Sequence, residues 1–153
     1  MRIWHKSLIP YLPREQLIAQ WRECSAIAGS IIKNGTPNHI LVNKILDYPI
    51  EEFIMYSILV RKEMSARGYK TMQSVMDKIL SLNPQFDGDV PRPLFKDWHN
   101  HRYLMQCFAN LQEKYDCGGI KEEDWKKVED YVLKNVFEVS IKDVKRGSYT
   151  ITI

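Results

Sequence analysis

Apolar side chains recur every three or four residues along most of the chain, a spacing typical of amphipathic α-helices. The pattern is clearest after Pro13, where a helix is predicted to run to Lys33. Proline is favoured in the first turn of a helix, and the Asn34-Gly35 pair that follows is a typical stop. The buried face of this helix is predicted to consist of Leu17, Trp21, Cys24, Ala28 and Ile31.

The same reading predicts further helices, separated by short breaks. They cover approximately residues 38–46, 49–67, 71–82, 97–114 and 121–135. The segment 83–93 is rich in proline, glycine and aspartate, which predicts a loop. No internal repeat or low-complexity segment interrupts the series.

Near the C-terminus the apolar spacing changes from three or four residues to two. Phe137, Val139 and Ile141 alternate with polar residues, and Tyr149 and Ile151 do so again after a break. This predicts a β-hairpin over 136–153, appended to a helical domain over 1–135. The predicted fold is therefore mainly α, one compact domain with a C-terminal β-hairpin extension. Exposed strand edges can pair with another chain, so the hairpin is the expected route to a homo-oligomer.

Length and composition are those of an ordinary globular domain. The chain has 153 residues, of which 44% are hydrophobic and 27% charged. Its longest apolar run, over 53–60, is far shorter than the roughly 20 residues of a membrane span. No basic-then-apolar leader opens the sequence. We expect a cytoplasmic protein that does not enter membranes.

Cysteine and histidine positions argue against disulfides and metals. Three widely spaced cysteines are typical of reduced thiols, and Cys24 falls on an apolar helix face, where it is expected in the core. None of the four histidines has the spacing of a zinc site, so structural roles are expected for them and neither metal nor cofactor is predicted. The absence of Gly-rich phosphate loops and of a Gly-x-Ser-x-Gly elbow disfavours nucleotide-binding enzymes and α/β-hydrolases.

The excess of positive charge lies in the first half of the chain. The net charge is +3, and residues 1–80 hold 11 Lys/Arg against 7 Asp/Glu. That half includes Arg22 and Glu23, neither of which has an oppositely charged residue three or four positions away. Both flank the apolar stripe, so their partners are expected from elsewhere in the protein, from solvent or from a ligand.

The N-terminal pattern resembles that of a known family. Arg2-x-Trp4, Leu12-Pro13, Leu17 and Trp21-Arg22-Glu23 are similar to the pyrimidine-dimer DNA glycosylase family of endonuclease V-like enzymes, in a bacterial branch. The resemblance extends over about residues 1–115. Further segments agree with it: Glu63 followed by Arg67-Gly68-Tyr69, Asn38-His39, and the Tyr103, Cys107, Asn110-Leu111 helix.

The resemblance implies a DNA repair enzyme, a glycosylase with abasic-site lyase activity on damaged double-stranded DNA. In this family the α-amine of the first residue attacks C1′ of the damaged nucleotide, the base leaves, an imine forms and β-elimination cuts the strand. An α-amine suits this role because its pKa, about 7.7–8.0, leaves a useful fraction neutral at cytosolic pH. Methionine is generally retained before arginine, so the matching amine is that of Met1.

The remaining site residues follow from the same resemblance. Glu23 would stabilise the cationic transition state and transfer protons, while Arg2 and Arg22 would bind phosphates, with His5 beside them in the substrate-binding set. Gln16 and Ala26 replace a histidine and an arginine of the best-known member. These departures favour an alternative, a non-catalytic nucleic-acid-binding or protein-binding helical domain that kept the family scaffold.

Overall fold

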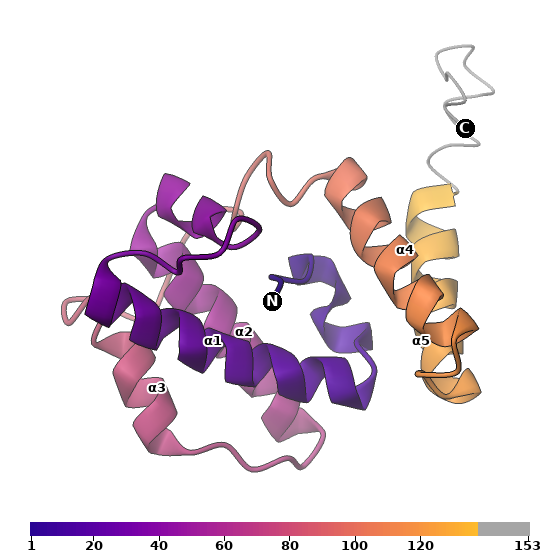
Figure 1. The fold of residues 1–153 in the computed structure, drawn as a ribbon, viewed down its shortest axis with the longest axis horizontal. Coiled ribbons are helices and arrows are strands. Elements are labelled where there is room, and N and C mark those ends of the chain that lie inside the picture. The colour runs from indigo at the N-terminus through magenta and orange to yellow at the C-terminus, as the bar shows by residue number, and fades with distance from the viewer. Residues whose placement is uncertain (138–153) are drawn as a thin grey trace.

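The structure, a computed structural model, describes residues 1–137 and is mainly helical. Its α-helices are α1 (Arg14–Asn34), α2 (Ile50–Ala66), α3 (Gln73–Leu80), α4 (His101–Asp116) and α5 (Glu122–Val132) (Figure 1). The predicted hairpin over 136–153 lies outside the described residues, except that its first two positions belong to a helical turn, η3 (Leu133–Phe137). Residues 1–137 contain no strand, and none of their helices is long and apolar enough to cross a membrane.

The long helix α1 confirms the first sequence prediction. Pro13 occupies its N-cap position, and Gly35 ends it in the left-handed conformation, with φ of 74°. The Gly35 amide donates to the Ile31 carbonyl at 2.8 Å, which satisfies one of the free carbonyls of the last turn. All five residues of the predicted inner face are buried or partly buried, and Cys24 is fully buried.

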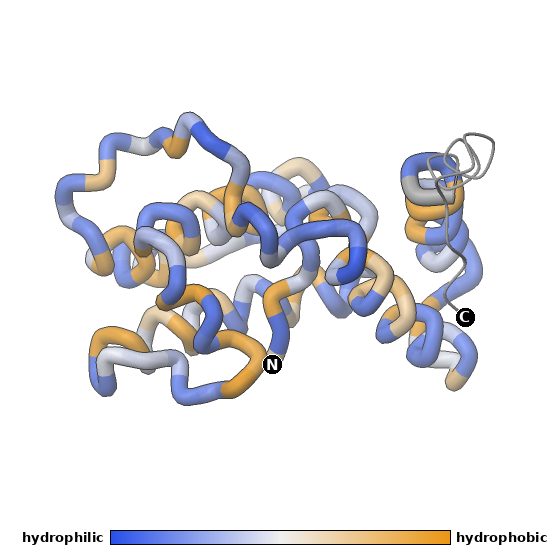
Figure 2. The backbone as a smooth tube through the Cα atoms, turned by 90° about the horizontal axis from the view of Figure 1, so that it is seen from above, coloured by the Kyte–Doolittle hydropathy of each residue, from blue (hydrophilic) through white to orange (hydrophobic). Residues whose placement is uncertain are grey.

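Helices α2 and α3 pack against α1 and complete one half of the fold. Pro49 precedes α2 as predicted, and the helix ends at Arg67, followed by Gly68 with φ of 81°. In Figure 2 the helical turns alternate between hydrophilic and hydrophobic along the tube, as expected for helices that bury one face.

Helices α4 and α5 form the other half, side by side (Figure 1). The predicted start of α4 at residue 97 is four residues too early, because Asn100 is the N-cap: its side chain accepts from the Tyr103 amide at 2.9 Å. Before it, Phe95 and Asp97 have positive φ values of 54° and 70°, which breaks any helix there. Trp125 of α5 stacks between Phe108 and Tyr115 of α4.

Two short 3₁₀ helices complete the described fold, η1 (Lys6–Tyr11) and η2 (Asn43–Asp47). The helix predicted over 38–46 is wrong in extent, since a turn precedes η2. The prediction missed η1, which is only six residues long and contains Pro10. Because η1 contacts both α2 and α5, the N-terminal segment lies in the centre of the fold, where Ile3 and Leu8 are fully buried (Figure 1).

Candidate active site

Side chains of α1 bind the backbone of the first residues. The Arg2 amide donates to Glu23 Oε2 at 3.2 Å, and the Trp4 amide donates to Gln20 Oε1 at 2.9 Å. The Gln20 side-chain nitrogen in turn donates to the Arg2 carbonyl at 3.0 Å. Gln20 is fully buried and lies one helical turn before Glu23, so one face of α1 holds residues 2–4 in register.

Two tyrosines hold the same segment from the opposite side. The Tyr56 hydroxyl of α2 donates to the Trp4 carbonyl at 2.6 Å, and Gln20 Oε1 lies 3.1 Å from the same hydroxyl. The Tyr103 hydroxyl of α4 donates to the Ile3 carbonyl. Burial raises the pKa of Tyr56 well above its usual value, which keeps this donor protonated. The chain's first residues are therefore anchored to three helices before any ligand binds.

These contacts set the position of the Met1 amine. A backbone nitrogen lies no more than about 3.7 Å from the next one along the chain. Adding the 3.2 Å from the Arg2 amide to Glu23 Oε2 puts the Met1 nitrogen within about 7 Å of that carboxylate oxygen. Among residues 1–137 the amine makes no ion pair within 4.0 Å.

Met1 and Glu23 share a groove of about 470 Å³ between α1 and α4. Glu23 is half-buried, and its Oε2 accepts from the Arg2 amide and, at 3.4 Å, from Gln20. Its other oxygen, Oε1, has no hydrogen-bond partner within the described part of the chain. The remaining lining residues are Arg2, Trp4, Glu15, Gln16, Ala19, Leu41, Asn110 and Lys114.

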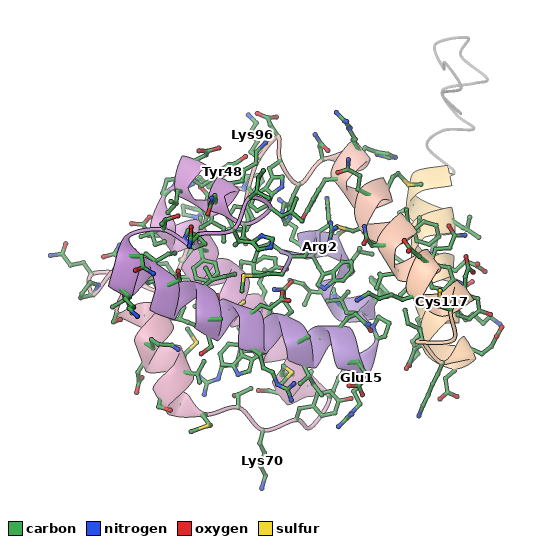
Figure 3. The ribbon with its side chains drawn as sticks, viewed as in Figure 1. Arg2, Glu15, Tyr48, Lys70, Lys96 and Cys117 are labelled. Carbon is green, nitrogen blue, oxygen red and sulfur yellow. The ribbon has the colours of Figure 1, made fainter. Side chains whose placement is uncertain are left out.

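A second hollow of about 510 Å³ adjoins the groove, since Arg2, Leu41 and Asn110 line both. It adds two cations from different elements, Lys44 of η2 and Arg102 of α4, and one carboxylate, Asp97. Figure 3 shows the Arg2 side chain between the α1 and α4 halves of the molecule. Its guanidinium lies 5.5 Å from the centre of the Trp4 ring, a cation–π distance that orients it.

Arg22 is exposed on α1 and lines neither hollow. It has no hydrogen-bond or ion-pair partner within residues 1–137. Ala26, one turn further along, is also exposed. The predicted pair therefore separates: Glu23 turns into the groove, and Arg22 stays free for a ligand outside it.

His5 has a different environment from that expected of a substrate contact. It is buried, and its Nδ1 accepts from the Ser7 amide at 3.1 Å, which caps η1. Its ring stacks on His99 with centroids 5.0 Å apart. Burial lowers the pKa of His5, so the neutral form is favoured. These contacts fit the structural role expected of the histidines as a group.

His99 is a second buried histidine at the N-terminal segment. Its Nδ1 accepts from the Lys6 amide at 2.9 Å. Burial, with smaller contributions from His5 and Lys6, lowers its pKa to about 2. His99 is therefore neutral at any physiological pH and acts as a fixed hydrogen-bond acceptor for the backbone.

Sequence reasoning missed Gln20 and Tyr56 as residues that hold the N-terminal segment. One signal was available on α1: Gln16, Gln20 and Glu23 are spaced by four and three residues, the same spacing as the apolar stripe. Polar residues at core spacing need hydrogen-bond partners, and here the N-terminal backbone supplies them to Gln20 and Glu23. Residues 1–137 contain no group of three or more His, Cys, Asp or Glu side chains that could hold a metal. Burial raises the pKa of Cys24 to about 12, which makes it a core residue.

The segment from Glu63 to Tyr69 has a structural role. The Arg67 guanidinium donates to the carbonyls of Leu12 at 2.7 Å and Pro10 at 3.1 Å, and pairs with Glu63 at 2.9 Å. Arg67 therefore fixes the connection between η1 and α1.

A family model described as pyrimidine dimer DNA glycosylase matches residues 1–77, which is half of the chain. The match includes α1 and α2, with Met1, Arg2, Gln20, Glu23 and Tyr56. No curated protein and no solved structure matches the chain.

Proposed function

The chain belongs to the pyrimidine dimer DNA glycosylase family, and from this membership we propose that it is a DNA glycosylase and abasic-site lyase that uses the Met1 α-amine. Its substrate would be damaged double-stranded DNA in the cytoplasm, with a pyrimidine dimer as the lesion. The protein needs no metal or cofactor for this chemistry, because the nucleophile and the proton-transfer group both come from the chain.

The observation that carries the proposal is the hydrogen bond from the Arg2 amide to Glu23 Oε2 at 3.2 Å. It ties the first peptide unit to the carboxylate of Glu23, which lines the same groove as Met1. A sugar C1′ placed between the amine and Glu23 would have a nucleophile on one side and an anion on the other. Such preorganised charge stabilises a cationic transition state.

The proposed reaction proceeds by nucleophilic substitution and elimination. The nitrogen lone pair of Met1 attacks C1′, the C1′–N glycosidic bond breaks, and the base leaves with that electron pair and takes up a proton. Loss of an amine proton and opening of the sugar ring, with protonation of O4′, give the imine. Removal of a C2′ proton then expels the 3′ phosphate. We assign the transfer of these protons to Glu23.

Cations around the two hollows would bind the DNA backbone. Arg2, Lys44, Arg102 and Lys114 line the hollows, and Arg22 is exposed on α1 outside them. Arg2, Arg22 and their neighbours would contact phosphates on either side of the lesion, which positions the duplex without reading its sequence.

Trapping with borohydride tests the proposal. Reduction of an imine by borohydride gives a stable secondary amine, so the protein should become covalently attached to DNA that contains an abasic site or a dimer. Peptide mapping of the adduct should locate it on Met1. Glu23→Gln keeps the size of the side chain but removes its charge and basicity, and should slow trapping by about 100-fold or more.

Glu15→Gln is the matched control. Glu15 lines the same groove on the same helix, but it is exposed and pairs only with Arg14. Its substitution should leave trapping unchanged. Equal losses in both variants would contradict the role given to Glu23.

Blocking the N-terminus separates the enzyme from the alternative, a non-catalytic nucleic-acid-binding or protein-binding domain. Acetylated protein, checked by intact mass to begin at Met1, should bind DNA but form no adduct. If unblocked protein forms no adduct with either damaged substrate, the enzymatic proposal is wrong and the binding domain replaces it.

A further inference from the structure

Two adjacent apolar side chains project into solvent at the edge of the groove. Ile40 is 89% exposed and Leu41 is 51% exposed. Single exposed apolar residues are common on protein surfaces, but an isoleucine this free of contacts buries almost none of its apolar surface. Their neighbour Val42 is fully buried and anchors the segment.

The turn that carries this pair is held by a network of hydrogen bonds. The Asn43 side chain accepts from the His39 amide at 3.0 Å, and the His39 carbonyl accepts from the amides of Val42 and Asn43 at 2.9 and 2.8 Å. The His39 ring accepts from the Leu41 amide at 3.3 Å.

The start of the turn is fixed as well. Asn38 has a left-handed φ of 56°, and its amide donates to the Thr36 hydroxyl at 3.1 Å. Ser30 of α1 donates to the Thr36 carbonyl at 2.7 Å. The Asn38-His39 pair singled out in the sequence therefore fixes the backbone that displays Ile40 and Leu41.

The position of the pair relates it to the candidate active site. Leu41 lines both hollows, together with Arg2, and Ile40 lines the hollow that contains Lys44 and Arg102. The turn runs back from α1 towards the N-terminus in Figure 1. The apolar tip is thus flanked by cations, and Asp97 is the carboxylate that lines the same hollow.

We propose that Ile40 and Leu41 form a wedge that enters the base stack of duplex DNA at the lesion, while the surrounding cations hold the phosphates. Apolar side chains inserted between base steps unstack and kink a duplex, and the extra contacts of the kinked duplex offset the cost of unstacking. A rigid turn suits this role, because little conformational entropy is lost when it inserts. The inference rests on the proposed function, since it assigns the substrate to the same groove.

Charge and size favour DNA over a protein partner for this tip. Two side chains on a turn are far smaller than the roughly 800 Å² that each partner of a stable protein complex buries. Lys44, Arg102 and Arg2 around the tip complement phosphates, as expected of a surface that grips a nucleic-acid backbone.

Fluorescence of 2-aminopurine tests the wedge without requiring catalysis. The probe would be a duplex with a tetrahydrofuran abasic analogue, which cannot form an imine, and 2-aminopurine as the adjacent base. The full chain should raise the fluorescence by unstacking that base. The double variant Ile40→Ser/Leu41→Ser should need about tenfold more protein to give the same rise in fluorescence. Ile40→Ser alone should have a smaller effect.

Ile32→Ser is the matched control, because Ile32 is an exposed isoleucine on α1 that lines neither hollow. Its response should equal that of the unchanged protein. An unaltered fluorescence response in the double variant would overturn the wedge. If, in addition, the double variant sediments differently from the unchanged protein, the tip binds protein instead of DNA.

Borohydride trapping on a single-stranded abasic oligonucleotide distinguishes failure of the wedge from failure of the proposed function. A single strand needs no unstacking of a duplex, so the double variant should form adduct there at the unchanged rate. Its rate on the corresponding abasic duplex should fall by about tenfold or more. If the unchanged protein forms no adduct on the single strand, the proposed chemistry fails, whatever the fluorescence shows.

Discussion

Two buried glutamines, one turn apart on α1, differ in their hydrogen bonding. Gln20 bonds to Arg2, Trp4, Tyr56 and Glu23, whereas Gln16 Oε1 is buried without a partner in the described chain. Gln20→Met removes partners from buried backbone groups and should lower the free energy of unfolding by about 2–4 kcal/mol. The yield of borohydride trapping should fall too, because Arg2 and Glu23 lose their hydrogen bonds to Gln20. Urea unfolding and borohydride trapping measure both effects.

Gln16→Met is the matched control on the same helix. Replacement of an unpaired buried amide by an apolar side chain of similar length should leave stability unchanged or raise it slightly. Equal destabilisation of the two variants would show that burial of the side chain, and not its hydrogen bonds, is what holds the N-terminal segment.

The buried histidine at the N-terminal segment makes stability depend on pH. Folding lowers the pKa of His99 to about 2 from an ordinary value near 6.5, so below pH 6.5 the unfolded chain binds a proton that the folded chain does not. The contribution of this site is full above pH 6.5 and is lost as pH falls towards 2. Between pH 7 and 5 the loss should be about 2 kcal/mol.

His99→Asn tests this, since asparagine keeps an acceptor for the Lys6 amide but does not titrate. Urea unfolding at pH 7 and pH 5 should show a smaller drop in the variant than in the unchanged protein. His39→Asn is the comparison, because His39 is only partly buried. Parallel pH profiles for His99→Asn and the unchanged protein would count against the histidine as the source.

At the scale of the element, the sequence predicts those helix ends that are set by local proline and glycine signals. The helices α1 and α2 begin after Pro13 and Pro49 and end before Gly35 and Gly68, as their proline and glycine signals indicate. The start of α4 was missed because Asn100 is the cap, and because Phe95 and Asp97 before it have positive φ values that the sequence pattern does not show.

The candidate site could be predicted only in part. Glu23 and Arg2 follow from a motif that is local in sequence. Their link through Gln20, Tyr56 and Tyr103 joins residues up to 100 positions apart, as in the bond from Tyr103 to Ile3. Such contacts leave no periodic pattern. The difference in burial between His5 and Arg2 likewise depends on how helices α2 and α4 pack against the N-terminal segment.

Arg67 connects two elements, and its substitution tests how firmly α2 holds the N-terminal region. Arg67→Ala removes hydrogen bonds to the carbonyls of Leu12 and Pro10 and leaves Glu63 without its partner. The expected loss in unfolding free energy is about 2–3 kcal/mol, because charge-assisted hydrogen bonds contribute more than neutral ones. Arg14→Ala breaks an exposed pair with Glu15 and a contact of the guanidinium with the Tyr69 ring at 5.5 Å, and should cost only about 1 kcal/mol. Thermal or urea unfolding compares the two variants; equal costs would refute the anchoring role.

At the scale of the molecule, the cations of the second hollow come from two separate parts of the fold. Lys44 lies on η2 and Arg102 on α4, with Arg2 from the centre between them. A duplex bound there would be held by both halves at once, and each phosphate contact would release bound counterions. DNA affinity should therefore fall steeply with salt, to a degree set by the number of these contacts.

Lys44→Ala and Arg102→Ala should each weaken binding at low salt and reduce the slope of log affinity against log salt by about 1. Lys70 provides the matched control, since it lines neither hollow and in Figure 3 it projects from the lower edge of the molecule, away from the central Arg2. Lys70→Ala should leave the slope unchanged. Fluorescence anisotropy with a duplex containing the tetrahydrofuran analogue measures all three variants. If only Arg102→Ala alters the slope, the duplex contacts the α4 half alone, and the DNA site lies around that helix. Equal slopes in all three variants and the unchanged protein would show that DNA does not bind to this face of the molecule.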